Sequence, residues 1–299
     1  MPEDLVYGKS ATDRWTFLAT AIVAVALALA FAKVSLKPLW QESAQSFIAP
    51  WAPIALVMLT RFIALACGIW AIISMFRVGP GNMQVLLHEQ RTMKLLHPVN
   101  FEKFVTFSSW TLLCNILYFG SVSVASVMTL NGNQVPLWLE RFEVSMFAIA
   151  CSSAFLTATI VRHILLPDLM KSDRDPNFLF TYHEQIMHNF AAIFLAVELV
   201  LVGPTLHPEF GLYCMGMGLF YVGFAYFFAY QGGGYYVYSF IDPRLKNAPF
   251  VMLALAAAIV VVYLMMTVAS IVVEMNPLFG ALLLAGWVSQ IVQFSPTKA

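Results

Sequence analysis

The sequence predicts an all-α, polytopic bundle of seven or eight membrane-spanning helices. Of its 299 residues, 60% are hydrophobic and 11% are charged, whereas a soluble domain has about 45–50% apolar and about 25% charged residues. Too few polar side chains remain to cover a water-facing globule, so the composition excludes a soluble domain and a disordered chain. The apolar residues gather in runs, and a helix needs about 20 of them to cross a bilayer. We expect one integral membrane domain over residues 1–299.

Eight apolar runs define the predicted helices. The first follows an acidic leader and exceeds the roughly 7–15 apolar residues of a signal peptide, so we expect it to be retained as a membrane helix. The last is short, and only Asn276-Pro277 separates it from the run before. It is predicted either to form a tight hairpin with that helix or to lie as a re-entrant or interfacial segment. The predicted helices cover 15–36, 52–76, 103–130, 142–166, 181–204, 209–231, 248–274 and 277–294.

Two connecting segments are long enough to have structure of their own. The segment 37–51 carries aromatic side chains among polar ones and is predicted to lie at the membrane interface. In the segment 77–102, residues 83–96 are predicted to form a short amphipathic surface helix. The three glycines at 232–234 are expected to end the sixth helix, because glycine destabilises a helix.

Basic residues are distributed unevenly over the predicted loops. Twelve of the sixteen lie on one side of the membrane and three on the other, while Arg61 lies within the second helix. Because positive charge accumulates in cytoplasmic loops, both termini are predicted to face the cytoplasm, matrix or stroma. Sixteen acidic residues balance the basic ones. Nucleic acid is therefore not an expected partner, since phosphate binding needs an excess of positive charge.

Polar side chains inside a membrane helix are the candidates for function, because burying them is costly. The fifth predicted helix begins with the sequence TYHEQIMH at 181–188 and carries Glu198 deeper in the membrane. At the i, i+4 spacing, Glu184 and His188 share one face of the helix. Glu184 is therefore expected to orient the His188 imidazole or to hold it protonated.

The same segment resembles a zinc-binding helix but has the wrong spacing. A zincin helix carries two histidines at i and i+4. Here His183 and His188 are five residues apart, which is about 140° around an α-helix. A third ligand would have to come from elsewhere, such as His163 or His88. We expect neither a metal nor another cofactor.

Thr106 is a candidate nucleophile near the start of the third predicted helix. By the charge distribution this helix and the fifth enter the membrane from the same side, with Thr106 about one turn inside and His188 roughly 12 Å from its own end. A hydroxyl nucleophile needs a neighbouring base, and neutral histidine is the usual one. Threonine is also common in membrane helices as a structural hydrogen-bonding residue, and that interpretation stays open.

Arg61 lies midway through the second predicted helix. A guanidinium at that depth has to face protein or water and needs an acidic partner. Candidate partners are Glu143, Glu184 and Glu198. A structural ion pair is one interpretation, and support of a functional site is the other.

Three short motifs follow one another along about three quarters of the chain. They are KFVTF at 103–107 with YFG at 118–120, Met187-His188 with Glu198, and GGYYVYSF at 233–240. In this order they resemble the Lys-Phe-Leu-Thr-Phe, Gly-Met-His and Gly-x-Trp-Val-Tyr-Pro-Phe segments of the androgen-induced-gene family, which includes the androgen-dependent TFPI-regulating protein. The chain departs from the family in its first helix, which is extra, and in a longer stretch between Thr106 and Gly120.

The resemblance implies a polytopic membrane hydrolase. Members of that family cleave fatty acid esters of hydroxy fatty acids with a threonine nucleophile and a histidine, and these roles would fall on Thr106 and His188. Glu184, Glu198 and Arg61 are expected to support the pair. One alternative is a non-catalytic subunit of a larger membrane complex, which binds partner membrane subunits and lipid. Another is a transporter, although inverted halves and paired broken helices are not seen. Membrane lipid is the expected partner throughout.

Overall fold

The structure confirms an all-α, multi-pass membrane bundle. The computed structural model describes residues 5–9, 11–171 and 175–296. In these residues seven helical segments are long and apolar enough to cross a membrane, and each overlaps a predicted span. The seven are α1 (Thr12–Lys33), α3 (Ile54–Arg77), α4 (Phe107–Leu130), α5 to α6 (Leu137–Lys171), α7 to α8 (Tyr182–Val202), Pro208–Gln231 with α9 (Gly211–Gln231), and α10 (Ala248–Met275).

Two of the spans are interrupted by a π-helical turn. The first turn, Val161–Leu165, lies between α5 (Leu137–Ile160) and α6 (Leu166–Lys171). The second, Ile186–Phe190, lies between α7 (Tyr182–Gln185) and α8 (Ala191–Val202). Each turn accommodates an extra residue without ending the helix, and such turns are frequent at functional sites.

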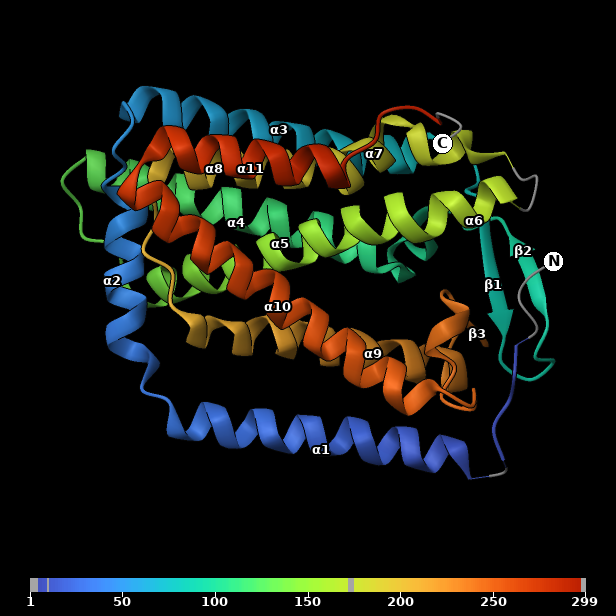
Figure 1. The fold of residues 1–299 in the computed structure, drawn as a ribbon. Coiled ribbons are helices and arrows are strands. Elements are labelled where there is room, and N and C mark those ends of the chain that lie inside the picture. Colours follow the sequence, from blue (N-terminus) through green and yellow to red (C-terminus); the bar gives the residue numbers. More distant parts are fainter. Residues whose placement is uncertain (1–4, 10, 172–174, 297–299) are drawn as a thin grey trace.

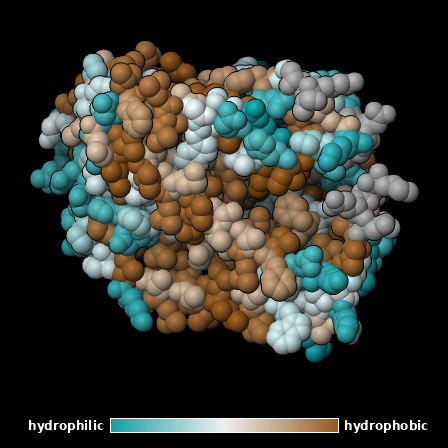
Figure 2. Space-filling model, viewed as in Figure 1, coloured by the Kyte–Doolittle hydropathy of each residue, from teal (hydrophilic) through white to brown (hydrophobic). Residues whose placement is uncertain are grey.

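The long helices run side by side along one direction of the molecule (Figure 1). The helix α2 (Leu36–Ile48) lies across one end of the bundle, and a small sheet lies at the opposite end (Figure 1). Apolar side chains cover most of the middle of the face in Figure 2, while hydrophilic ones gather towards its two ends. Apolar flanks between polar ends are what a bilayer requires of an embedded bundle, so the chain is an integral, multi-pass membrane protein.

The last helix, α11 (Pro277–Ile291), forms the tight hairpin that was one of the two predictions for it. The Asn276 side chain caps the helix by accepting from the Phe279 N–H at 3.0 Å. Gly280 permits the close approach to α10, because a Cβ atom there would lie 2.7 Å from the Cα of Val273. At 15 residues, α11 is about 22 Å long, which is less than the ~30 Å of a hydrocarbon core.

The predicted interfacial segment is helical and packs firmly on the bundle. The Phe47 side chain of α2 is fully buried, and the Trp40 Nε1–H donates to the Tyr213 hydroxyl at 2.7 Å. The Arg141 guanidinium lies 4.4 Å from the centre of the Trp40 ring. The helix therefore closes one end of the bundle, and its position at the membrane interface stays a prediction.

The prediction of a surface helix over 83–96 is wrong. This segment is an antiparallel hairpin of β1 (Met83–Leu87) and β2 (Met93–Leu96), and β3 (Tyr235–Tyr236) pairs with the other edge of β1. Short apolar runs do not distinguish a helix from a strand. Here the strand conformation of β1 is stabilised by β3, which is remote in sequence and gives β1 a second hydrogen-bonded neighbour.

The three glycines end α9 at Gln231, as predicted, and lead directly into β3. Gly234 has a φ of 75°, in the left-handed region that glycine adopts without steric cost. Its carbonyl accepts the N–H of His88 at 2.8 Å. The turn therefore attaches the end of α9 to the hairpin and sets the position of β3 beside β1.

A buried ion pair joins four helices near the α2 end. Arg61 is fully buried, and its Nη2 lies 2.6 Å from Oε1 of Glu198 on α8. Its other N–H groups donate to the Ser126 hydroxyl at 2.5 Å and to the Phe47 carbonyl at 3.0 Å. Of the three predicted partners, Glu198 is the one that pairs with Arg61. The carboxyl of Glu143 is also buried, and it has no hydrogen-bond partner among the described residues.

We expect Arg61→Met to destabilise the bundle by about 3–5 kcal/mol, because the substitution leaves the Glu198 carboxyl buried without its counter-charge. The free energy of unfolding in mixed micelles is the measurement. The double variant Arg61→Met with Glu198→Leu removes both charges and is expected to recover part of the loss. A double variant less stable than the single one would contradict this explanation.

We also expect the sheet to loosen at acid pH. Burial and the nearby Arg244 lower the pKa of His88 below its ordinary value of 6.5, so the neutral Nδ1 can accept the Tyr236 hydroxyl at 3.2 Å. A lowered folded-state pKa leaves stability unchanged above about pH 6.5 and reduces it as the pH falls below that value. Amide hydrogen exchange of the hairpin measures the effect. The variant His88→Gln cannot titrate, and an equal pH dependence in that variant would refute the assignment.

Candidate functional site

The second π-helical turn brings two imidazoles to one carboxylate. His183 precedes the turn and His188 lies within it. The Nε2 atoms of the two rings lie 3.7 Å and 3.4 Å from the two carboxylate oxygens of Glu184. In an α-helix the two side chains would point about 140° apart. The π-helical turn has more residues per turn, which reduces that angle and brings the two rings closer together. No group of three or more metal-binding side chains is found within 5–9, 11–171 and 175–296.

Thr106 is the N-cap of α4, so it lies just before the helix and is not part of it. The segment Asn100–Val105 is a 3₁₀ helix, and α4 begins at Phe107. The Thr106 hydroxyl accepts from the Ser109 N–H at 3.2 Å and lies 2.8 Å from the Ser109 hydroxyl. The third predicted helix, 103–130, therefore begins four residues later than predicted, and the depth of Thr106 in a membrane stays a prediction. The helix starts later than its apolar run because a threonine hydroxyl satisfies a free N–H of the first turn.

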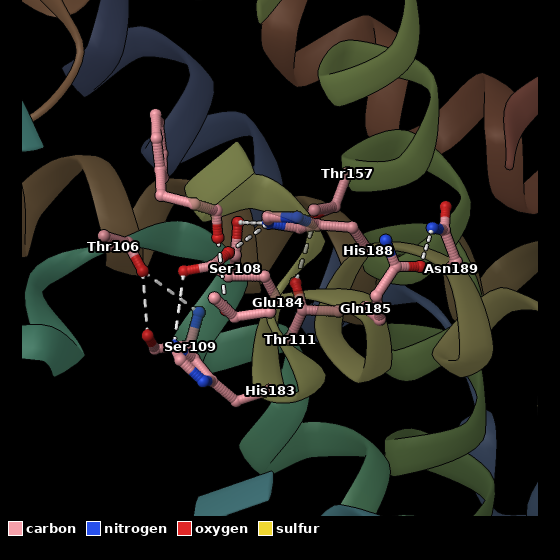
Figure 3. A network of polar contacts seen from close by, with 12 residues as sticks. Thr106, Ser108, Ser109, Thr111, Thr157, His183, Glu184, Gln185, His188 and Asn189 are labelled. Carbon is pink, nitrogen blue, oxygen red and sulfur yellow. Dashed lines mark hydrogen bonds and ion pairs between the residues drawn. The ribbon is translucent and has the colours of Figure 1, made fainter. Parts of the chain in front are cut away.

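The hydroxyl that contacts the histidine belongs to Ser108. Its Oγ lies 3.0 Å from Nε2 of His188, and both residues are buried. Figure 3 shows this contact beside the separate Thr106–Ser109 pair. Sequence reasoning missed Ser108, although a signal was present. Ser108, Thr111 and Asn115 are buried at i, i+3 and i+7, which makes a polar stripe along α4.

The protonation of His188 decides what the contact does. Its Nδ1 is buried and has no hydrogen-bond partner among the described residues. When Nδ1 carries the ring proton, Nε2 is a free acceptor for the Ser108 hydroxyl proton. The Glu184 carboxylate, 3.4 Å from the same Nε2, favours the protonated ring that forms once His188 has taken that proton. The three groups are therefore arranged for proton transfer.

These side chains line a cavity of about 440 Å³ at the sheet end of the bundle. Its walls include Thr106, Ser108, Glu184 and His188, together with the chain around Gly79 and residues 237–240. The cavity is large enough for several atoms of a ligand beside the Ser108 hydroxyl. Since its rim is built by the hairpin and the polar loops, one end of it lies at the polar end of the bundle.

Tyr238 and Lys103 hold the walls of this cavity. The Tyr238 hydroxyl accepts the Phe107 N–H at 3.3 Å, and burial raises the pKa of Tyr238 to about 12, so the phenol is neutral at neutral pH. The Lys103 ammonium donates to the carbonyls of Met75, Val78 and Gly79 at 2.6, 3.0 and 3.0 Å, and burial lowers its pKa. Lys103 thus closes the end of α3 against the start of α4.

Two of the predicted supporting residues lie elsewhere. Arg61 and Glu198 are in the buried network at the α2 end and are not among the residues that line the cavity. Glu184 is the predicted supporting residue that contacts His188. The structure therefore separates a polar cluster that joins helices from the cluster that lines a cavity.

Comparisons of the chain with models of protein families, with curated protein sequences and with solved structures gave no match. The resemblance to the androgen-induced-gene family thus stays a prediction based on the three motifs. Thr106, His188 and Tyr238 come from the three motif segments, and all three line the cavity.

We expect Lys103→Met to destabilise the cavity rim, because three backbone carbonyls lose a charged donor. A hydrogen bond to a charged group contributes about 1.5–3 kcal/mol, so a loss of this size in the free energy of unfolding is expected. Faster hydrogen exchange at 78–82 would locate the effect. Lys94→Met is the matched control, since Lys94 is exposed on the neighbouring β2. Equal effects of the two variants would exclude the proposed role of Lys103.

Proposed function

We propose that the protein is an intramembrane hydrolase of lipid esters in which Ser108 is the nucleophile and His188 is its general base. The observation that carries the proposal is the 3.0 Å contact between Ser108 Oγ and His188 Nε2 at the wall of the cavity. A serine hydroxyl is a weak nucleophile until a base removes its proton. Thr106, which the family resemblance favours, lines the same cavity and is the competing nucleophile.

The proposed reaction has two steps. In the first, Ser108 Oγ attacks the ester carbonyl carbon while His188 Nε2 takes its proton, and the alcohol leaves with that proton. In the second, water attacks the acyl group on Ser108, His188 takes a proton from the water, and the carboxylic acid leaves as the proton returns to Ser108. Proton transfer by a positioned histidine contributes typically about 10²–10⁴-fold to the rate. In each step Glu184 would stabilise the His188 imidazolium after it has taken the proton and before it gives the proton up.

The start of α4 is suited to stabilise the charge that develops on the carbonyl oxygen. Ser108 is the second residue of the helix, where the helix dipole favours negative charge. The neutral Tyr238 phenol lies on the same cavity wall. The helix dipole and the phenol are already oriented before the reaction begins, so stabilising the charge needs no rearrangement of the protein.

A lipid is the substrate class that fits the location. The reacting groups belong to membrane-spanning segments, and the exposed side chains of the bundle are apolar at positions such as Val25, Phe250 and Leu282. An ester that reaches Ser108 through the flanks of the bundle has to be soluble in the bilayer. The other two predicted functions gain no specific support. Arg61, the charged residue within the second predicted helix, is held by three protein groups: the Glu198 carboxylate, the Ser126 hydroxyl and the Phe47 carbonyl.

We expect Ser108→Ala and His188→Ala to lower esterase turnover by at least about 10²–10⁴-fold and Ser108→Ala to abolish covalent labelling by a fluorophosphonate. Thr106→Val keeps the size of the side chain and removes only its hydroxyl, and labelling should persist. The measurements are hydrolysis of a fatty acyl ester in micelles and gel detection of the label.

Each other outcome has a definite meaning. Loss of labelling in Thr106→Val but not in Ser108→Ala would move the nucleophile to Thr106. Normal turnover in both Ser108→Ala and Thr106→Val, or in His188→Ala, would refute the proposed hydrolase. Thermal unfolding of each variant separates loss of chemistry from loss of fold.

A further inference from the structure

A second cavity lies deeper in the bundle and is almost entirely apolar. It has a volume of about 100 Å³ and lies between α1, α5, α9 and α10. Its walls include Val23 from α1, Gly218 and Leu219 from α9, and Met252 and Ala256 from α10. All of these residues belong to candidate membrane-spanning helices, so most of this cavity lies between the helices of the bundle.

The two cavities meet at the candidate nucleophile. Ser108, Leu165, Tyr238 and Phe240 line both of them. A molecule whose reacting group lies at Ser108 can therefore extend one part into the polar cavity and another part into the apolar one. This continuity is independent of the contact with His188 that supports the proposed reaction.

The chemistry of the apolar cavity indicates its occupant. A buried water needs two to four polar partners. The walls formed by α9 and α10 offer apolar side chains, Gly218 and Tyr221, whose hydroxyl already donates to the Val105 carbonyl at 3.0 Å. Only an apolar group gains by entering such a space, at about 25 cal/mol per Å² of apolar surface removed from water. Inside a bilayer the available group of that shape is the hydrocarbon chain of a lipid.

We propose that the apolar cavity is the binding site for one acyl chain of the substrate. The chain lies between α9 and α10, the ester carbonyl lies at Ser108, and the alcohol part occupies the larger cavity towards the sheet. Tyr238 and Phe240 stand at the boundary between the two parts. This inference rests on the proposed function and names its substrate class, a long-chain fatty acyl ester.

Gly218 is the position that tests the chain site. A Cβ atom there would be 3.8 Å from Ile259, an ordinary contact, so a larger side chain fits the helix and fills the cavity. We expect Gly218→Leu to lower the ratio of kcat/KM for a palmitoyl ester to that for a butyryl ester by about tenfold or more, since each methylene in an apolar pocket contributes about tenfold or more to discrimination. Ala256→Leu fills the cavity from α10 and is the second variant.

The matched control is Gly223→Leu. Gly223 lies on the same helix, a Cβ atom there meets nothing within 4 Å, and the residue does not line the cavity. The chain-length ratio of this variant should equal that of the unmodified protein. An unchanged ratio in both Gly218→Leu and Ala256→Leu would overturn the chain site.

A binding experiment separates this inference from the proposed reaction. A palmitoyl ester with a diazirine in the middle of its chain is photo-crosslinked to the His188→Ala variant, which does not need to turn it over. We expect labelled peptides from α9 and α10, and loss of that label when Gly218→Leu is added. Crosslinks that Gly218→Leu leaves unchanged would overturn the chain site. Labelling as expected without ester turnover in any form of the protein would overturn the hydrolase and leave the chain site standing.

Discussion

The Arg61–Glu198 ion pair is the interaction on which the arrangement of the bundle most depends. A guanidinium within hydrocarbon is costly unless it is paired and fully hydrogen-bonded, so the helices that carry its partners have to meet around it. Those partners come from α8, α4 and α2. The same requirement holds α2 across the end of the bundle, where an amphipathic helix alone could slide along the membrane surface.

The membrane helices could be predicted from the sequence, whereas the structure of the polar end could not. Apolar runs determine which segments enter a bilayer, so the predicted spans overlap all seven long helices. The partner of Arg61 was among three candidates, and the choice of Glu198 needed the packing of α3 on α8. The hairpin at 83–96 was missed because its second neighbour, β3, lies about 140 residues further along the chain. Pairing between remote segments leaves no trace in local periodicity.

The candidate site was predicted in part for a similar reason. His188 and Glu184 were found because they are polar residues one turn apart in an apolar helix, and they are in contact. Ser108 was missed because its role depends on where α4 begins. With Thr106 as the cap, Ser108 is turned towards His188 and Thr106 towards Ser109. The π-helical turn likewise changes the facing of every residue after it, and no spacing rule for an α-helix includes that shift.

The position of the larger cavity makes the proposed chemistry one-sided. Its rim is built from the hairpin, the start of α4 and the loop after β3, which all lie at one end of the bundle. The water that the reaction consumes would enter from the compartment on that side, while the apolar part of the substrate would arrive from the plane of the membrane. The alcohol would be released from the larger cavity towards that compartment, and the fatty acid, whose chain lies in the apolar cavity, would return to the bilayer. The positions of the two cavities would therefore direct the two products to different environments without a conformational change.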